Sequence, residues 1–405
     1  CIHGVFQASK NEGHPLMIFN DIMESKGHRV AINLLTRDRL AKSMKIPASE
    51  IVDILGRAME NLSTPNLIAA EKSPVMESGQ EEVDLFKLPI PWHYPEDRGR
   101  YMSSSIIIAE YDGRRNVSFH RQFVRDETHV VARLVPRHLR TMLDEANSAG
   151  VEIPIGIVNA PDPVVLLAAA MSFDEHIDEL EVASSLHMEL YGTPLDVVKL
   201  ENGVIVPAES EYAMSATITL AVDEEGPYVD ITGTVDDVRN EPVIRIDKIH
   251  HRSDPIFHAL IPAQAEHRTL MGLPRAPTIK KAVNEVTECV DVYLSDGGCG
   301  WLSSVVAINP KTSQDSIKAI NAALEGHKSM KQVTIVDSDI DVSNPIHVEW
   351  AMATRWQPDK DTIILSDQKG SSLDPSRSEA GLTAKVGFDA TIPFGDDRKK
   401  YSSIL

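Results

Sequence analysis

Ser105-Ile-Ile-Ile-Ala109 and Asn116-Val-Ser-Phe119 are two apolar stretches on either side of the dipeptide Asp112-Gly113. Asp-Gly between alternating apolar residues is typical of a two-residue hairpin turn, because glycine tolerates the left-handed backbone that such a turn requires. The alternation of apolar and polar residues continues to Val130-Val131. The stretch from Met102 to Val131 therefore predicts paired antiparallel strands in a β-rich core.

Helical patterns precede and follow this stretch. Pro47 to Leu62 carries apolar residues at helical spacing, and Asp162-Pro163 supplies an acid cap followed by proline in the first turn of a helix. The other elements predicted before residue 273 are helices at Arg137–Ser148 and His176–Leu190 and strands at Leu195–Leu200, Ala213–Val222 and Tyr228–Thr234. This order indicates a β-rich core that helices interrupt.

Beyond Leu273 strands and helices alternate, as in an open α/β domain. The elements predicted there are strands at Val290–Leu294, Ser303–Ile308, Gln332–Val336 and Thr362–Leu365 and a helix at Ser313–His327. Near residue 90 the prolines Pro89, Pro91 and Pro95 are typical of a linker. We therefore predict an α+β protein with an N-terminal α/β region (1–90), a central domain (91–272) and a C-terminal α/β domain (273–405).

The composition excludes several classes of protein. Sixty acidic against forty basic residues give a formal charge of −20, which disfavours nucleic acid as a partner. No run of 18 apolar residues suggests a membrane span. Three scattered cysteines (Cys1, Cys289 and Cys299) are too few for a disulfide framework and indicate a reducing cytoplasm. The sequence begins at Cys1 and not at a methionine, which leaves room for a short piece before it.

Three residues from separate elements form a candidate cation site. Asn116, His138 and Glu179 supply an amide oxygen, an imidazole and a carboxylate, a set that suits Mn²⁺ or Mg²⁺ better than a structural zinc. Each of them alone reads as an ordinary strand, helix-start or surface residue. Glu181 is an alternative to Glu179, because residues two apart on a helix point in different directions and only one of them faces the site.

Arg121 and the turn Glu225-Gly-Pro-Tyr-Val-Asp230 form a second set. An arginine between two carboxylates keeps one ionised by charge attraction, while burial and mutual repulsion favour a proton on the other. Such a pair suits proton donation. The alternative is an acidic surface turn, which the neighbouring Asp223 and Glu224 also fit.

The order and spacing of these residues, from about Phe86 to Pro393, resemble the UbiD-type decarboxylases, which use a prenylated flavin mononucleotide. Loss of CO₂ from an sp² carbon leaves electrons that arginine and carboxylates cannot delocalise, so an organic cofactor must accept them. The resemblance implies a central split β-barrel that binds the flavin, a C-terminal domain that mediates oligomerisation, and an α,β-unsaturated acid as substrate.

The resemblance also implies roles for individual residues. Arg121, Glu225 and Asp230 match the catalytic set, although many relatives have glutamate where this chain has Asp230. Asn116, His138 and Glu179 match ligands of a cation, Mn²⁺ or Mg²⁺, that bridges to the flavin phosphate, and K⁺ is a further expected ion. The residues expected to bind the cofactor are Asn116, Ser118, Phe119, His120, Arg121, Arg137, His138, Glu179 and Lys385.

Two sequence strings resemble the archaeal branch of the family assigned to trans-anhydromevalonate 5-phosphate, which it converts to isopentenyl phosphate in isoprenoid biosynthesis. They are Glu266-His-Arg-Thr-Leu-Met-Gly272 and Gly370-Ser-Ser-Leu-Asp-Pro375. Basic candidates for the substrate phosphate are Arg133, Arg137, Arg140, His267 and Arg268. The alternative substrate is an aromatic acid of the polyprenyl 4-hydroxybenzoate type. Expected partners are a UbiX-type flavin prenyltransferase, which supplies the cofactor, and further copies of this chain in a dimer or hexamer.

Other clusters have simpler interpretations. The run Asp337-Ser-Asp339-Ile-Asp341 lacks the glycine and final acid of a calcium loop and reads as the polar end of a strand. The histidines at 250, 251, 258 and 267 fit no zinc motif, and Gly297-Gly-Cys-Gly300 reads as a tight turn. Two rival functions remain: a non-catalytic scaffold of the same fold, and a metal-dependent hydrolase centred on the Asp337 run.

Overall fold

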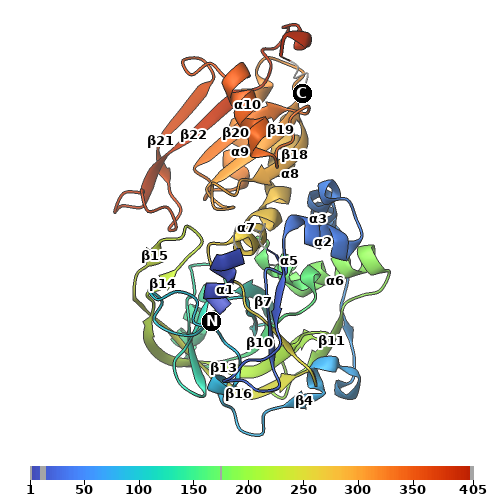
Figure 1. Cartoon of the computed structure of the whole chain (residues 1–405), viewed down its shortest axis with the longest axis vertical. Helices are drawn as coiled ribbons and strands as arrows, with labels where there is room; N and C mark the ends of the chain where they lie inside the picture. Colours follow the sequence, from blue (N-terminus) through green and yellow to red (C-terminus); the bar gives the residue numbers. More distant parts are fainter. Residues whose placement is uncertain (1, 10–14, 174–175, 402–405) are drawn as a thin grey trace. The chain divides into compact units, whose positions relative to one another are not determined.

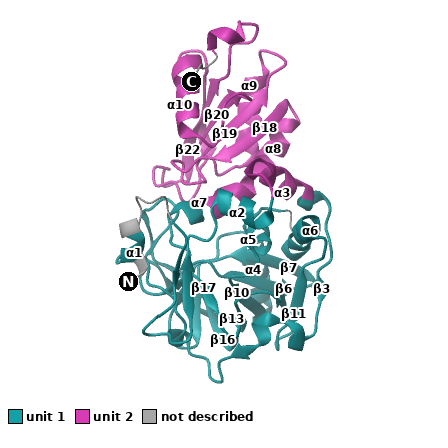
Figure 2. Ribbon diagram, turned by 45° about the vertical axis from the view of Figure 1, so that its right-hand side comes forward, with its two compact units in different colours: residues 1–45, 58–267 teal, residues 46–57, 268–405 magenta. Residues whose placement is uncertain are grey.

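The computed structural model describes residues 2–9, 15–173 and 176–401. By its internal contacts the chain divides into two units, coloured teal and magenta in Figure 2. Unit 1 comprises residues 1–45 and 58–267, and unit 2 comprises residues 46–57 and 268–405. The predicted helix near Pro47 therefore belongs largely to unit 2, and a separate N-terminal domain ending at residue 90 stays a prediction.

A large antiparallel sheet, with strands of different lengths, forms the centre of unit 1 (Figure 1). Its strands, in spatial order, are β5 (Tyr101–Met102), β8 (Gln122–Val124), β9 (His129–Ala132), β16 (Arg239–His251), β13 (Tyr212–Glu225), β10 (Ile153–Asn159), β6 (Ile106–Tyr111) and β7 (Arg114–Phe119), and β4 (Ser78–Gly79) also pairs with β16. Among the described residues this series starts at β5 and ends at β7 without closing into a barrel. The α+β class is confirmed.

Smaller sheets and helices complete unit 1. The small sheets are β1 (Met17–Phe19), β2 (Arg29–Ile32) and β17 (Ile256–His258); β12 (Ile205–Pro207), β11 (Asp196–Lys199) and β3 (Asn66–Leu67); and β14 (Tyr228–Val229) with β15 (Val235–Asp236). The helices are α1 (Ile2–Ser9), α2 (Arg37–Met44), α4 (His138–Ala149), α5 (Pro163–Ala170) and α6 (Glu179–Tyr191). Helices α3 (Ile51–Glu60) and α7 (Ala265–Gly272) run across the division between the units.

The predicted hairpin is confirmed by β6 and β7, whose turn has positive φ at Asp112 (50°) and Gly113 (72°). Helix α4 packs Leu139, Met142 and Leu143 into the apolar core that the sheet strands share. Each such side chain contributes roughly 1.5–3 kcal/mol when it leaves water, so this packing fixes α4 on the sheet. Helices α5 and α6 contact each other, and both contact β7.

The sheet of unit 2 confirms the predicted α/β alternation. Its strands, in spatial order, are β18 (Glu288–Leu294), β19 (Ser303–Asn309), β20 (Gln332–Asp337), β22 (Leu382–Ala390) and β21 (Thr362–Lys369), and its helices are α8 (Ala276–Asn284), α9 (Asp315–Gly326) and α10 (Pro345–Arg355). Strands β19, β20 and β22 run parallel. Helix α9 packs tightly on β22, since a Cβ at Gly387 would lie 2.2 Å from the Ile320 side chain.

Two of the predicted element boundaries that differ from the structure lie at the candidate site. The strand expected over Tyr228–Thr234 ends at Val229, because the chain turns there: the Gly233 amide donates to the Asp230 carbonyl at 2.8 Å. The helix expected from His176 starts at Glu179, where the Asp178 side chain caps it by accepting from the Leu180 amide. Both changes place an acidic side chain of the candidate site at the edge of an element.

Candidate active site

Strand β7 and the start of α6 bring two of the predicted cation ligands together. Asn116 on β7 donates from Nδ2 to Glu179 Oε1 at 2.9 Å, and the Val117 amide donates to Glu179 Oε2 at 2.9 Å. Both side chains are buried, with Glu179 5% exposed. Burial raises the pKa of Glu179 to about 8, although the hydrogen bonds from Val117 and Asn116 act in the opposite direction. A cation beside this carboxylate would favour its ionised form.

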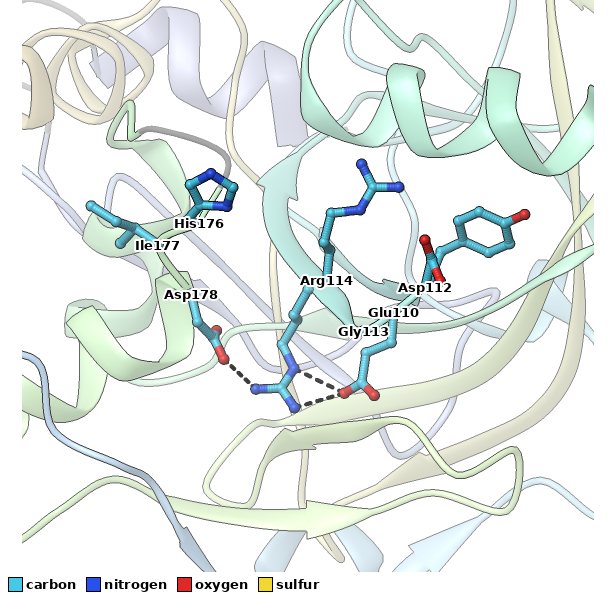
Figure 3. A pocket seen from close by; sticks show the side chains of 9 residues that line it. Glu110, Asp112, Gly113, Arg114, His176, Ile177 and Asp178 are labelled. Carbon is cyan, nitrogen blue, oxygen red and sulfur yellow. Dashed lines mark hydrogen bonds and ion pairs between the residues drawn. The ribbon is translucent and has the colours of Figure 1, made fainter.

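An ion-pair cluster holds α6 against β7 from the other face of the strand. Arg115 donates from Nε to Glu110 Oε1 at 2.8 Å and forms a second ion pair with Asp178. These contacts are the dashed lines in Figure 3, at a polar cavity of about 430 Å³ that His176 and Tyr111 also line. Because Asp178 caps α6 with its other oxygen, Arg115 couples the strand to the residue that precedes Glu179.

The third predicted ligand is less directly connected. His138 is the first residue of α4 and is half-buried, and no hydrogen bond or ion pair joins it to Asn116 or Glu179 in the described parts of the chain. Glu181, the alternative carboxylate, is half-buried in the same first turn of α6, two residues after Glu179. Among the described residues, no group of three His, Cys, Asp or Glu side chains is spaced to hold a metal. An amide ligand such as Asn116 lies outside that set of residue types.

Ser118 and His120 continue the polar row that Asn116 begins. Ser118 Oγ lies 2.8 Å from Asn116 Oδ1 and 2.9 Å from His120 Nε2. Burial lowers the pKa of His120 to about 4, so its ring is neutral at pH 7, and its Nδ1 lies 3.0 Å from the Arg133 carbonyl. Nδ1 is therefore the protonated nitrogen, and Nε2 accepts. Phe119 ends β7 next to this row.

Arg121, immediately after β7, forms ion pairs with three carboxylates. It binds Glu225 through two parallel hydrogen bonds, Nε to Oε1 at 2.9 Å and Nη2 to Oε2 at 2.8 Å. Nη1 donates to Asp230 Oδ2 at 2.7 Å. The Arg121 side chain is 8% exposed and that of Glu225 is 0% exposed, whereas that of Asp230 is 20% exposed. Burial opposes the charge of Arg121, but Glu225, Asp230 and a third acid raise its pKa further above its usual range.

The third acid, Asp236, was missed in the sequence analysis. Its Oδ2 accepts from Arg121 Nη2 at 2.8 Å, and Arg239 binds both of its oxygens at 2.7 and 2.8 Å. Partial burial opposes ionisation of Asp236, but Arg239 and Arg121 outweigh it and lower its pKa to about 2. The signal in the sequence was the acidic pair Asp236-Asp237, which follows the Glu225 turn but lies outside the motif.

Replacing Asp236 with asparagine is expected to cost roughly 1 kcal/mol of stability at pH 7, a value reduced for solvent screening of a half-buried pair. Because the folded-state pKa is lowered from 3.8 to about 2, this contribution is complete above pH ~4 and disappears as the pH falls through ~2. Urea unfolding of parent and variant at several pH values should show the difference closing in that window. An equal difference at pH 2 and pH 7 would contradict it.

The remaining predicted residues lie as follows. Lys385 belongs to β22 of unit 2, where its Nζ donates to the Lys328 carbonyl at 2.6 Å. Arg133 and Arg140 both pair with the buried Glu241. The other basic candidates are Arg137, the cap residue of α4, His267, whose Nδ1 accepts from the Ala263 amide, and Arg268 in unit 2. Two of the proposed phosphate ligands thus already have carboxylate partners: Arg133 and Arg140 share Glu241, and Arg140 also pairs with Asp144.

The acidic run at Asp337, the histidines near residue 250 and the glycine-rich turn before Trp301 have the structural roles that the sequence predicts. Asp337 ends β20 and pairs with Arg355 and Arg398, while Asp339 also binds Arg355, so arginines pair with two of the three acids in this run. His250 pairs with Glu201, and His258 pairs with Glu266. The turn before Trp301 has positive φ at Cys299 and Gly300.

Comparisons with known proteins identify the family. The model of the 3-octaprenyl-4-hydroxybenzoate carboxy-lyase Rift-related domain, UbiD, matches residues 67–265, and that of the corresponding C-terminal domain matches residues 268–390. The chain belongs to the UbiD family. UbiD-family relatives include an anhydromevalonate phosphate decarboxylase from Methanosarcina mazei, 40% identical over 96% of this chain and 90% of that protein. The corresponding protein from Methanocaldococcus jannaschii is 38% identical over 97% of this chain and 92% of its own length.

Solved structures agree with this UbiD assignment. The UbiD-class enzyme HmfF from Pelotomaculum thermopropionicum, solved in complex with FMN, is 32% identical and aligns with a TM-score of 0.93. The alignment covers 100% of this chain and 91% of HmfF. None of the described helices has the length and apolar character that a membrane crossing requires.

Proposed function

We propose that this UbiD-family protein is a prenylated-FMN-dependent decarboxylase that converts trans-anhydromevalonate 5-phosphate to isopentenyl phosphate. The main support for this proposal is the Arg121 cluster, in which a buried guanidinium binds both Glu225 and the more accessible Asp230. The names of the two archaeal relatives support the substrate. The aromatic acid remains the alternative substrate, because the name of the matching family model refers to one.

The two acids differ in their freedom to donate a proton. Both oxygens of Glu225 are bound to Arg121, Oε1 also accepts from the Tyr101 hydroxyl at 3.1 Å, and its side chain is 0% exposed. Asp230 has a single contact to Arg121, and its Oδ1 accepts from the Ile231 amide. Its side chain is partly exposed. When bound, the prenylated flavin supplies the electron sink for CO₂ loss. We assign the proton that replaces CO₂ to Asp230, and the orientation of Arg121 to Glu225.

Asn116 and Glu179 would hold a cation, which would neutralise charge beside the flavin phosphate. Their oxygens form a buried set in which Glu179 receives two neutral hydrogen bonds and no positive charge from the residues the structure describes. A buried carboxylate without a cation is costly, and Mn²⁺ or Mg²⁺ would compensate it. We retain His138 as the third ligand and Lys385 as a phosphate ligand. A further K⁺ remains a prediction.

Replacing Glu179 with glutamine is expected to remove bound metal and flavin together, because glutamine cannot supply the charge that holds the cation. Glu181→Gln, on the same helix, is the matched control and should keep both. Metal analysis and visible absorption of the purified variants check this. Full Mn²⁺ occupancy in Glu179→Gln with loss in Glu181→Gln would move the ligand role to Glu181, and full occupancy in both would exclude this site.

The substrate is tested by the CO₂ that the flavin-loaded protein releases from each of the two acids. Turnover of trans-anhydromevalonate 5-phosphate well above that of a 4-hydroxybenzoate is expected. Turnover of the aromatic acid alone would overturn the isoprenoid assignment and leave the decarboxylase chemistry standing. A protein that never acquires visible absorption on incubation with the cofactor would instead favour the scaffold alternative.

The partners follow from the same proposal. A UbiX-type prenyltransferase supplies the cofactor, and the chain assembles with copies of itself; one relative, HmfF, has been solved in an evolved dimeric form with prenylated FMN. We place the protein in the cytoplasm on its cysteine usage. The two described cysteines, Cys289 and Cys299, form no disulfide, and burial raises the pKa of Cys289 to about 12.

A further inference from the structure

Besides β15 and β16, which pair with it, the Tyr94–Tyr101 segment also holds the turn that carries both acids of the site. Along the backbone of the turn, the Arg98 amide donates to the Pro227 carbonyl at 2.9 Å, and Arg98 Nη1 donates to the Glu224 carbonyl at 2.7 Å. The Gly226 amide donates to the Tyr101 hydroxyl at 3.2 Å. The segment therefore contacts the acid turn at successive residues and not at one anchor.

Asp97 makes the contact nearest to the proposed proton donor. Its Oδ1 accepts from the Val229 amide at 2.8 Å, and its Oδ2 accepts from the Tyr94 amide at 3.0 Å. The residue is 3% exposed, and no ion pair joins it to a cation in the described part of the chain. Val229 directly precedes Asp230, so the carboxylate of Asp97 fixes the backbone from which the Asp230 side chain departs.

Retaining a buried carboxylate for this purpose has an energetic cost. Burial raises the pKa of Asp97 to about 6, against the hydrogen bonds from the Val229 and Tyr94 amides. A neutral asparagine could accept only one of these two amide hydrogens and would turn a donor toward the other. The carboxylate is thus suited to accepting from two backbone amides at once, that of Tyr94 in its own segment and that of Val229 in the acid turn.

Tyr101 makes the matching contact at the other acid. Its hydroxyl donates to Glu225 Oε1 at 3.1 Å, and its ring lies 4.5 Å from that of Tyr228. Tyr228 in turn covers Arg121, whose Cζ is 4.8 Å from the ring centre. Tyr101 therefore packs on Tyr228, and Tyr228 on Arg121, which limits movement of the guanidinium between Glu225 and Asp230.

We propose that Asp97 and Tyr101 are positioning residues for the decarboxylation, holding Asp230 and Glu225 at their places on Arg121. This inference rests on the proposed function of the same site. Proton transfer requires the donor within hydrogen-bond reach of the reacting carbon, and a misplacement of about 1 Å costs on the order of 10²-fold in rate. Neither residue touches the reacting atoms in this proposal; each acts through the turn it holds.

The test uses Asp97→Asn and Tyr101→Phe in the full-length, flavin-loaded protein. Each should lower kcat by roughly 10- to 100-fold with KM changed less than about threefold, because the substrate-binding groups stay in place. Asp162→Asn is the control: Asp162 also accepts a backbone amide, that of Val164, at the start of α5. It should keep the parental kcat.

A second readout does not depend on turnover. Amide hydrogen exchange in the flavin-free protein should accelerate at residues 225–236 in Asp97→Asn and Tyr101→Phe, with the rest of unit 1 unchanged. Parental kcat in both variants, unchanged exchange in this stretch, or faster exchange throughout unit 1 with a general loss of thermal stability would each overturn the positioning role. If the parent itself releases no CO₂, the proposed function fails, while the exchange data still decide whether Asp97 and Tyr101 hold the turn.

Discussion

Replacing Asp230 with asparagine is expected to lower turnover by roughly 10²- to 10⁴-fold, the range for loss of a general acid, while flavin remains bound. Asparagine preserves the size of the side chain and can still accept from Arg121, so the change removes the acidic group and its charge but keeps this hydrogen bond. Asp230 is singled out because its side chain is 20% exposed, whereas that of Glu225 is 0% exposed. The measurements are CO₂ release and the visible absorption of the loaded variant.

Asp237→Asn is the control for this variant, since Asp237 is an exposed acid in the same stretch of chain. It should retain parental turnover. If Asp230→Asn decarboxylates at the parental rate, the proton donor lies elsewhere and Glu225 becomes the next candidate. If the variant loses its flavin absorption, Asp230 has a binding role and the assignment of the proton fails.

The second large effect is expected for Arg121→Met, which leaves Glu225 buried without a cation. Removing one partner of a buried ion pair typically costs roughly 3–5 kcal/mol, because the remaining charge is uncompensated. Urea unfolding of the flavin-free protein at pH 7 measures this loss. Arg121→Lys keeps the charge but replaces the two parallel hydrogen bonds to Glu225 by a single point of contact, so it should fall between parent and Arg121→Met.

Adding Glu225→Gln to Arg121→Met gives the internal control. The double variant should recover much of the lost stability, because the uncompensated charge is gone. A loss below about 1 kcal/mol in Arg121→Met alone would resemble an exposed salt bridge and would contradict the buried cluster.

The parts of the fold that were predicted correctly have local signals. The β6–β7 turn follows from Asp112-Gly113, which adopts the positive φ that this turn requires. Helix α5 follows from Asp162-Pro163, whose aspartate accepts from the Val164 amide. Both depend on residues within a few positions of each other, so the sequence contains the cause.

Strands β16 and β22, which the sequence analysis did not predict, lack local signals of this kind. Strand β16 contains Pro242, which normally argues against a strand inside a sheet; in the structure Pro242 pairs with Val222 next to a register shift. Strand β22 carries the buried Lys385 and Gly387, and Gly387 is explained only by the close approach of α9. These features depend on what packs against the strand and not on neighbouring residues.

The candidate site divides in the same way. The motif positions Arg121, Glu225 and Asp230 could be named from the sequence, and the structure brings them onto one guanidinium. Asp236 joins the cluster only because β14 and β15 fold back on each other. Asp97 is absent from every motif considered, because its partner Val229 is 132 positions away in the chain.

The central claim is that this chain removes CO₂ from an unsaturated acid with the help of a prenylated flavin. The most direct measurement is CO₂ release from trans-anhydromevalonate 5-phosphate by the same preparation before and after loading with prenylated FMN. We predict multiple turnovers after loading and none before it. Equal CO₂ release with and without the flavin, or none from either acid by a fully loaded protein, would contradict the account.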